Sequence, residues 1–287
     1  MIALPVAGHT MAAPHLDVAD AIRFFAAQGL DGIEIVWQDD YRCGIPEQTE
    51  PSQLREIRRI ADGEGLSVVG LGPYMRGTNS LDASVRDDAK ARFRTCIDAA
   101  GILGATNVRF YGGGLEGGGP RVAAERWKHL VASLHEVAEY ASAAGVSVLV
   151  ENHMGTMTES AADSVTLVQQ ADSPGAGILY DQLNLLRSGY ESAVEAIALQ
   201  APYIRHVHVK DFEPASGNPG DVWTAPPRAL GDGTMDWTTV FRELAAIGYS
   251  GAITLEYEAR WYPEHLPLPD VGVPRSAAYA RELMRTV

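Results

Sequence analysis

Apolar residues along the chain follow two different spacings that replace each other in turn. Short runs rich in β-branched and aromatic residues, which are typical of buried β-strands, alternate with segments whose apolar residues have the three- and four-residue spacing of an amphipathic helix. The predicted strands are IALPVAG (2–8), GIEIVW (32–37), SVVGLGPY (67–74), TNVRFYG (106–112), VSVLVEN (146–152), GAGILYD (175–181), IRHVHVKD (204–211) and AITLEYE (252–258).

Helices are expected between these strands and after the last one, over residues 18–29, 54–65, 89–104, 125–145, 160–171, 190–200, 237–248 and 276–287. Several end in a glycine just before the next strand. Glycine accepts the left-handed conformation that closes many helices, so C-caps are predicted at Gly29, Gly65, Gly104, Gly145 and Gly248.

Strict alternation of strands and helices predicts parallel strands joined by right-handed crossovers. Because the units follow one another without a linker or a break in composition, we expect one α/β domain over residues 1–287, folded as a single (β/α)8 TIM barrel. The glycine run GGGLEGGG (112–119) lacks the order of a dinucleotide-binding loop, and we expect a mobile loop over the barrel mouth there. The irregular stretches 212–235 and 259–273 are expected to build the active-site face.

Composition narrows the class of partner. The formal net charge is −14, and no cluster of Lys and Arg resembles a phosphate-binding surface, so no nucleic-acid partner is expected. No apolar stretch approaches the ~20 residues of a membrane span, so no membrane partner is expected either. Cys43 and Cys96 form no disulfide framework, which favours a cytoplasmic protein.

Side chains that can bind a metal follow four consecutive predicted strands. Each interrupts or ends a run that should be buried, and a buried carboxylate is costly unless it is paired or coordinated. One imidazole with three carboxylates suits Mn²⁺, Mg²⁺ or Co²⁺, and Zn²⁺ also accepts these ligands. These residues are Glu151, Asp181, a histidine of the pair His206 and His208, and a glutamate of the pair Glu256 and Glu258. Within each pair both side chains face the same side of the strand, so spacing leaves the choice open.

The motifs ENH (151–153), YDQLN (180–184), HVHVKD (206–211), GDGTMDW (231–237) and LEYE (255–258) resemble those of the xylose isomerase-like TIM-barrel superfamily, the sugar phosphate isomerase/epimerase-type proteins. The resemblance covers essentially the whole chain. It implies one divalent metal ion, with Mn²⁺ favoured, held by Glu151, Asp181, His208 and Glu256. It thereby selects His208 and Glu256 within their pairs.

The implied activity is that of a metal-dependent isomerase or epimerase of a keto-sugar or keto-polyol, which removes an α-proton to form a metal-stabilised enediolate. The candidate catalytic residues are His153, Glu151 and Glu256. His153 leaves its strand on the same face as Glu151, and a neutral imidazole suits a general base. The Glu-x-His pattern also resembles 3-dehydroshikimate and keto-inositol dehydratases, and a C-glycoside deglycosylase-like elimination from a 3-keto glycoside remains open. A metal-dependent lyase is therefore the alternative.

Two positions depart from the ketose 3-epimerases, which have a His where this chain has Asn184 and an Arg where it has Pro214. An endonuclease-IV-like DNA repair enzyme is a remote alternative, because the third and fourth strand ends carry no histidine for its zinc cluster. A non-catalytic sugar-binding barrel is another.

Further polar and aromatic residues lie at or just past strand ends, Glu34 and Arg260 among them. Aromatic rings there would line the pocket, and Lys210 would orient a hydroxyl or carboxylate of the substrate. A homo-oligomer or a small partner subunit is compatible with the sequence. The candidate substrate-binding residues are Lys210, Tyr74, Tyr111, Arg109, Trp37, Trp261 and His9.

Overall fold

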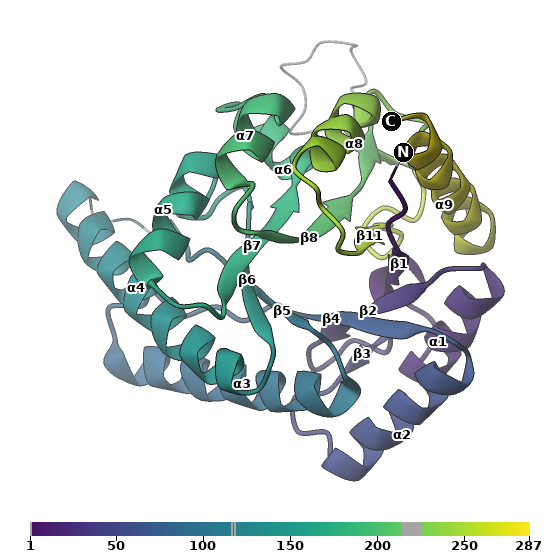
Figure 1. The fold of residues 1–287 in the computed structure, drawn as a ribbon. Coiled ribbons are helices and arrows are strands. Elements are labelled where there is room, and N and C mark those ends of the chain that lie inside the picture. Colours follow the sequence, from purple (N-terminus) through teal and green to yellow (C-terminus); the bar gives the residue numbers. More distant parts are fainter. Residues whose placement is uncertain (1, 116, 118, 214–224) are drawn as a thin grey trace.

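The computed structural model describes residues 2–115, 117, 119–213 and 225–287. Figure 1 shows a ring of strands enclosed by helices. The strands of the ring are β1 (Val6–His9), β2 (Gly32–Trp37), β4 (Ser67–Pro73), β5 (Asn107–Phe110), β6 (Ser147–Glu151), β7 (Ala176–Asp181), β8 (Ile204–Val209) and β11 (Ile253–Leu255). Neighbouring strands run parallel, and β1 pairs with both β2 and β11, which closes the barrel. The predicted TIM barrel is confirmed, and each barrel strand overlaps a predicted run.

Helices cover the outside of this barrel, as the alternating pattern predicted. They are α1 (Val18–Ala27), α2 (Pro51–Gly63), α3 (Ala83–Leu103), α4 (Gly119–Ala143), α5 (Ala161–Ala171), α7 (Ala193–Gln200), α8 (Trp237–Ala246) and α9 (Pro269–Thr286). The five glycines predicted as C-caps all have φ between 71° and 75°. Helices α3 and α4 begin several residues earlier than predicted, because their first turns are exposed and carry no apolar periodicity.

Short elements that the sequence pattern did not predict follow the carboxyl ends of the strands. They are η1 (Thr10–Ala12), β3 (Gly44–Ile45), α6 (Gln182–Ser188), and the antiparallel pair β9 (Asp211–Phe212) and β10 (Pro227–Arg228). The Asp211 carboxylate accepts the backbone N–H groups of Gly231 at 3.0 Å, Gly233 at 3.3 Å and Met235 at 3.2 Å. One side chain therefore connects the HVHVKD and GDGTMDW motifs.

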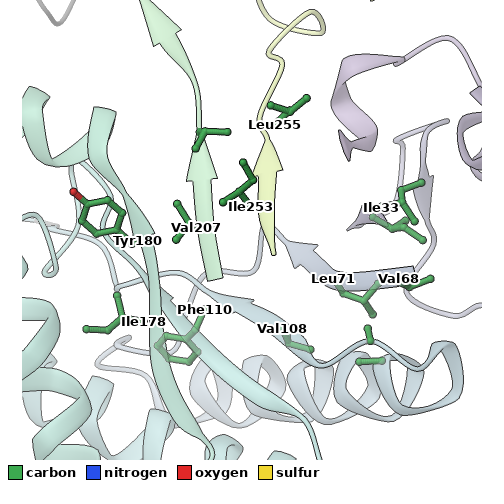
Figure 2. Packing of buried hydrophobic residues seen from close by; sticks show 14 of the residues in the cluster. Ile33, Val68, Leu71, Val108, Phe110, Ile178, Tyr180, Val207, Ile253 and Leu255 are labelled. Carbon is green, nitrogen blue, oxygen red and sulfur yellow. The ribbon is translucent and has the colours of Figure 1, made fainter. Parts of the chain in front are cut away.

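The main hydrophobic core lies between the barrel strands and the helices. Alternate strand residues such as Val207, Ile253 and Leu255 belong to this core (Figure 2). Phe110 of β5 meets Phe93 of α3 with ring centroids 5.1 Å apart. Full burial of such a side chain stabilises the fold by roughly 1.5–3 kcal/mol. In each strand, the residues that lie between these core residues face the barrel axis. The inner face of the barrel is therefore available for polar side chains.

Two of the expected loops are described only in part. Gly114 of the glycine run forms an isolated antiparallel bridge with Thr156, while residues 116, 118 and 214–224 lie outside the described residues. Pro214 and ten further residues of the 212–235 stretch are therefore among the positions left out. Within the described part of the chain, none of the helices combines the length and the apolar character that crossing a membrane requires.

Candidate metal centre

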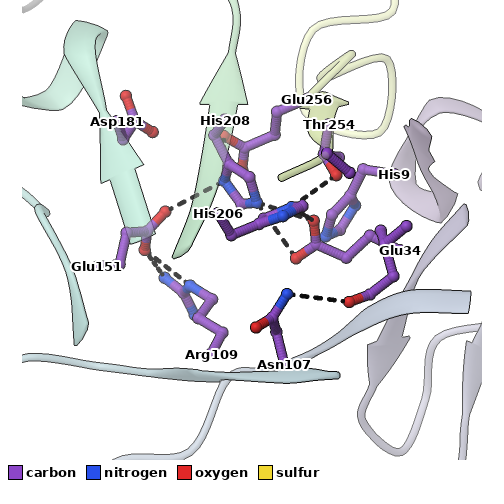
Figure 3. Close-up of polar contacts among 12 residues, drawn as sticks. His9, Glu34, Asn107, Arg109, Glu151, Asp181, His206, His208, Thr254 and Glu256 are labelled. Carbon is purple, nitrogen blue, oxygen red and sulfur yellow. Dashed lines mark hydrogen bonds and ion pairs between the residues drawn. The ribbon is translucent and has the colours of Figure 1, made fainter. Parts of the chain in front are cut away.

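Polar side chains from both halves of the chain converge on the barrel axis near the carboxyl ends of the strands (Figure 3). Strand pairing places them at similar heights, because Asp181 is the register partner of His208. One ligand atom from each of four residues lies within 4.8 Å of the other three. These residues are Glu151, Asp181, His208 and Glu256. The structure thus brings together the four strand-end ligands predicted from the sequence.

His208 is oriented by a carboxylate on the far side of its ring. Its Nε2 lies 2.9 Å from Oε2 of Glu34, which is 2% exposed. Its Nδ1 points into the carboxylate cluster, 3.5 Å from Oε1 of Glu151 and 3.4 Å from Oε2 of Glu256. This buried Nδ1 has no hydrogen bond to a described residue. A carboxylate that fixes one ring nitrogen while the other faces further donors is the usual arrangement of a metal-binding histidine.

Glu151 is held ionised by an arginine from the neighbouring strand. Nε of Arg109 donates to Oε2 of Glu151 at 2.7 Å, and Nη1 of Arg109 donates to the carbonyl oxygen of Pro73 at 3.0 Å. Burial alone would raise the pKa of Glu151, but the charge of Arg109 and the nearby ring of His208 lower it to about 2. Oε1 of Glu151 remains directed at the cluster as an anionic donor.

Lys210 connects the two other carboxylates of the cluster. Its Nζ lies 2.8 Å from Oδ2 of Asp181 and 2.6 Å from Oε2 of Glu256. Burial alone would lower the pKa of Lys210, but these carboxylates raise it well above its usual value. The same ammonium and His208 hold the pKa of Glu256 well below its usual value, against the opposing effect of burial.

The charges of this centre fit a divalent cation. Among the described residues, four carboxylates contact two permanently charged cations, Arg109 and Lys210, which leaves two negative charges. The carboxylates are those of Glu34, Glu151, Asp181 and Glu256. Without an ion, burial would lower the pKa of His208, but Glu34 and Glu256 raise it well above its usual value. Metal binding at Nδ1 would replace that proton. The donor set, its burial and the orphaned Nδ1 therefore suit a divalent metal ion.

The two positions that strand parity left open have different surroundings. His206 lies deeper along β8, where its Nε2 is 2.8 Å from Oγ1 of Thr254 and 3.1 Å from Glu34. It belongs to a second compact group with Glu34 and His208. Burial raises the pKa of Glu258 to about 7, and this residue is outside both groups. Geometry thus associates His208 and Glu256 with the four-ligand cluster, as the resemblance implied.

His153 follows β6, two residues beyond Glu151, and is near enough to act electrostatically on the Glu151 carboxyl group. Its Nδ1 is 2.7 Å from the carbonyl oxygen of Met154, which only accepts hydrogen bonds. Nδ1 therefore carries the ring proton, and Nε2 of the neutral ring keeps its lone pair. The ring is partly buried and packs 5.5 Å from the ring of Tyr111. An imidazole with a free basic nitrogen next to the cluster is able to accept a proton.

The predicted substrate contacts lie in different surroundings. The guanidinium of Arg109 lies over the rings of Tyr74 at 5.0 Å and Tyr111 at 5.9 Å, which gathers these three at the mouth. Trp37 is fully buried in the hydrophobic core, whereas Trp261 is 51% exposed. His9, at the end of β1, is buried with its ring 6.1 Å from that of His208.

Comparison with known proteins agrees with this fold. The sequence profile of the family described as Xylose isomerase-like TIM barrel matches residues 22–285. The chain belongs to this family. The resemblance drawn from the sequence motifs is thereby confirmed.

Proteins similar to this chain differ in the activities that their names state. An inosose dehydratase of Geobacillus thermodenitrificans is 29% identical over 152 residues, which span 48% of this chain and 49% of the relative. The match thus covers about half the length of that enzyme. A D-psicose 3-epimerase of Ruminiclostridium cellulolyticum is 26% identical over 71% of this chain and 68% of its own. The structure of 3-keto-D-glucoside 4-epimerase from E. coli superposes with a TM-score of 0.77 at 17% identity, covering 99% of this chain and 100% of the other.

Sequence reasoning did not predict the roles of three supporting residues, although it had noted Glu34 and Asn184. The orienting role of Glu34 required knowing that β2 faces β8 across the barrel. Asn184 donates from Nδ2 to Oδ2 of Asp181 at 2.8 Å, and its place three residues after the aspartate was the available signal. Tyr41 stacks on Tyr74 with centroids 5.8 Å apart and meets Trp261 at 6.4 Å, yet it lies in a loop that no pattern distinguished.

Proposed function

We propose that this protein is a divalent-metal-dependent isomerase or epimerase of a keto-sugar or keto-polyol, which acts by removing an α-proton. One observation carries the proposal. The four-ligand cluster lies next to a histidine whose Nε2 keeps its lone pair, because Nδ1 of His153 is committed to the carbonyl oxygen of Met154. A binding protein needs no such base, so the arrangement favours catalysis over sugar binding alone.

Each residue of the cluster has a role in the proposal. A divalent ion, with Mn²⁺ favoured and Mg²⁺, Co²⁺ or Zn²⁺ as alternatives, would supply Lewis acidity to a carbonyl and an adjacent hydroxyl oxygen. The ligands would be Glu151, Asp181, His208 and Glu256. Glu151 and Glu256 are catalytic through the ion that they hold, since nearby cations keep their pKa values low. Lys210 neutralises Asp181 and Glu256 and can orient a substrate oxygen.

His153 is the proposed general base. Its Nε2 would accept the proton from the carbon next to the carbonyl group. In an isomerase the proton would return to the neighbouring carbon, whereas in an epimerase the same carbon would be reprotonated on its opposite face. Tyr74, Tyr111 and Arg109 would contact the substrate at the mouth, where their rings and guanidinium group meet. Trp261 and the buried Trp37 are weaker candidates for direct contact.

A metal-dependent lyase is the second candidate function, favoured by the similarity to inosose dehydratases over half of their length. Removal of an α-proton is common to both reactions. In the lyase the β-hydroxyl group then departs as water, whereas in the epimerase the carbon is reprotonated. The product therefore distinguishes the two functions.

Proton NMR in deuterated water tests the proposal, with diamagnetic Mg²⁺ as the added ion and D-psicose, D-tagatose, D-fructose and 2-keto-myo-inositol as probes. We expect loss of an α-proton signal from at least one probe, abolition of this exchange by a chelator, and its restoration by Mg²⁺. A new diastereomer would identify an epimerase, and an unsaturated or deoxygenated product a lyase. Exchange that persists in metal-stripped protein, or its absence from every probe, would contradict the proposal.

The same assay tests whether His153 is the general base. His153→Ala should keep the bound metal, because His153 is outside the ligand set, but should lower the exchange rate by about 10²–10⁴-fold. His135→Ala is the matched control, since His135 lies on α4 and its Nδ1 likewise bonds a carbonyl oxygen, that of Ala171. Undiminished exchange in His153→Ala would exclude His153 as the base.

A further inference from the structure

His9 lies inside the proposed centre although it contributes no ligand atom to the cluster. It ends β1 and is the register partner of Glu34 on β2. On the other side, Gly8 pairs with Leu255 of β11, so His9 is level with the next residue, Glu256. The side chain is 2% exposed, and Figure 3 shows it among the converging polar groups. A polar ring in this position requires a chemical explanation.

The hydrogen bond at Nδ1 fixes the protonation of the His9 ring. The backbone N–H of Met11 donates to this Nδ1 at 3.3 Å, so that His9 caps the short helix η1. A ring nitrogen that accepts a hydrogen bond cannot carry a proton. His9 is therefore neutral, with its single proton on Nε2.

The Nε2–H group of His9 is an unused donor. Among the described residues, the one hydrogen bond of the His9 ring is that at Nδ1. It faces the end of β4, where a Cβ atom added to Gly72 would lie 3.3 Å from Nε2. Glycine at this position leaves the space in front of the donor free of a side chain. The donor therefore lies near the carboxyl ends of the strands, level with the proposed metal ligand Glu256.

His9 and His153 are neutral histidines with opposite tautomers. The carbonyl oxygen of Met154 accepts from Nδ1 of His153, so Nε2 of His153 remains an acceptor. The backbone N–H of Met11 donates to Nδ1 of His9, so Nε2 of His9 carries the proton and is a donor. The backbone thus sets one ring to accept a proton and the other to donate a hydrogen bond. Removal of an α-proton needs both, because negative charge develops on the carbonyl oxygen as the proton leaves.

We propose that His9 is a further catalytic residue, whose Nε2–H donates a hydrogen bond to the substrate oxygen that gains negative charge. His9 keeps its proton throughout, so no group is transferred. This inference rests on the proposed function and deepens it, since it assigns the second charge-stabilising group of the same site. A preorganised donor of this kind contributes about 10²–10³-fold to a rate.

The tautomer is tested without turnover. Long-range ¹H–¹⁵N NMR of protein labelled at histidine nitrogens distinguishes the two neutral tautomers and the imidazolium, and His9→Gln assigns the His9 signals by their disappearance. We expect the Nε2–H neutral form of His9 and the Nδ1–H neutral form of His153 at neutral pH in the Mg²⁺-loaded protein. An imidazolium or an Nδ1–H form at His9 would overturn the inference, whatever the activity.

The catalytic role is tested with two substitutions in the α-proton exchange assay described above, on whichever of the four probes the wild type exchanges. His9→Leu removes the donor, and we expect kcat to fall by about 10²–10³-fold with full metal content. His9→Gln can place an amide N–H near the position of Nε2, and we expect it to retain most of the lost rate. A His9→Leu rate within threefold of the wild type, or equal losses in both variants, would overturn the inference. Absence of exchange in the wild type would instead contradict the proposed function and leave the tautomer result to decide the state of His9.

Discussion

At the scale of single residues, the ligand candidates are recognisable because each places a charge where a buried strand should be apolar. Glu151 and Asp181 end strands whose other residues pack in the core. Chemistry alone could not choose between His206 and His208, since both face the barrel axis and both are buried. The deciding feature is three-dimensional: Nδ1 of His208 faces two carboxylates, whereas His206 contacts Thr254 and Glu34.

Glu34 is predicted to determine metal affinity without binding the metal. Its carboxylate accepts from Nε2 of His208 and thereby directs Nδ1 toward the cluster. Glu34→Gln should weaken binding of the divalent ion about 10–100-fold, the usual cost of losing such an orienting group. Isothermal titration with Mn²⁺ measures the change. Glu47→Gln is the matched control, because Glu47 is also a buried carboxylate but pairs with Arg92 outside the centre. Equal affinities in wild type and Glu34→Gln would refute this role.

At the scale of elements, strands and helices were predictable because their apolar spacings differ, and their ends because glycine marks them. The short elements and irregularities that position supporting residues of the site were not predictable. Helix α6 is only seven residues long and begins directly after Asp181, which is its N-cap. The sequence there predicts the end of a strand. A helix of seven residues is too short to show a helical spacing of apolar residues. The register shift between Ile33 and Glu34 is likewise invisible in the apolar pattern.

Helix α8 offers a prediction about pH. Asp236 caps it by accepting the backbone N–H of Thr239 at 3.0 Å and the Thr239 hydroxyl at 2.7 Å. These two hydrogen bonds lower the pKa of Asp236. Asp236→Ala should cost about 1 kcal/mol of unfolding free energy at neutral pH. A carboxylate whose folded pKa is lowered stabilises above its unfolded pKa, so the deficit should shrink as the pH falls through about 3.9.

Urea denaturation of wild type, Asp236→Ala and Asp236→Asn at several pH values measures this contribution. Asparagine caps helices as well as aspartate does, so Asp236→Asn should be close to the wild type at neutral pH and should become the more stable of the two at acidic pH, because its cap does not titrate. A deficit in Asp236→Ala that stays constant down to acidic pH would contradict the assignment to the ionised carboxylate.

At the scale of the whole molecule, the site exists because the barrel closes. The hydrogen bond between Glu34 and His208 joins residues 174 positions apart, and Ile2 donates to the carbonyl oxygen of Met284 at 3.0 Å near the two chain ends. The count of strand and helix units predicted closure, and with it that strand ends meet on one rim. Which side chains touch across the barrel depends on strand stagger and tilt, which a single sequence does not encode in any local pattern.

The central claim is that one divalent ion binds Glu151, Asp181, His208 and Glu256, and metal content tests it most directly. After loading with Mn²⁺ and exhaustive dialysis, elemental analysis should find one ion per chain in the wild type. His208→Asn and Glu256→Gln should lose it, while the parity partners His206→Asn and Glu258→Gln should keep it, because they are outside the four-ligand cluster. A wild type that retains no ion, or His208→Asn and Glu256→Gln variants that retain a full equivalent, would contradict the account.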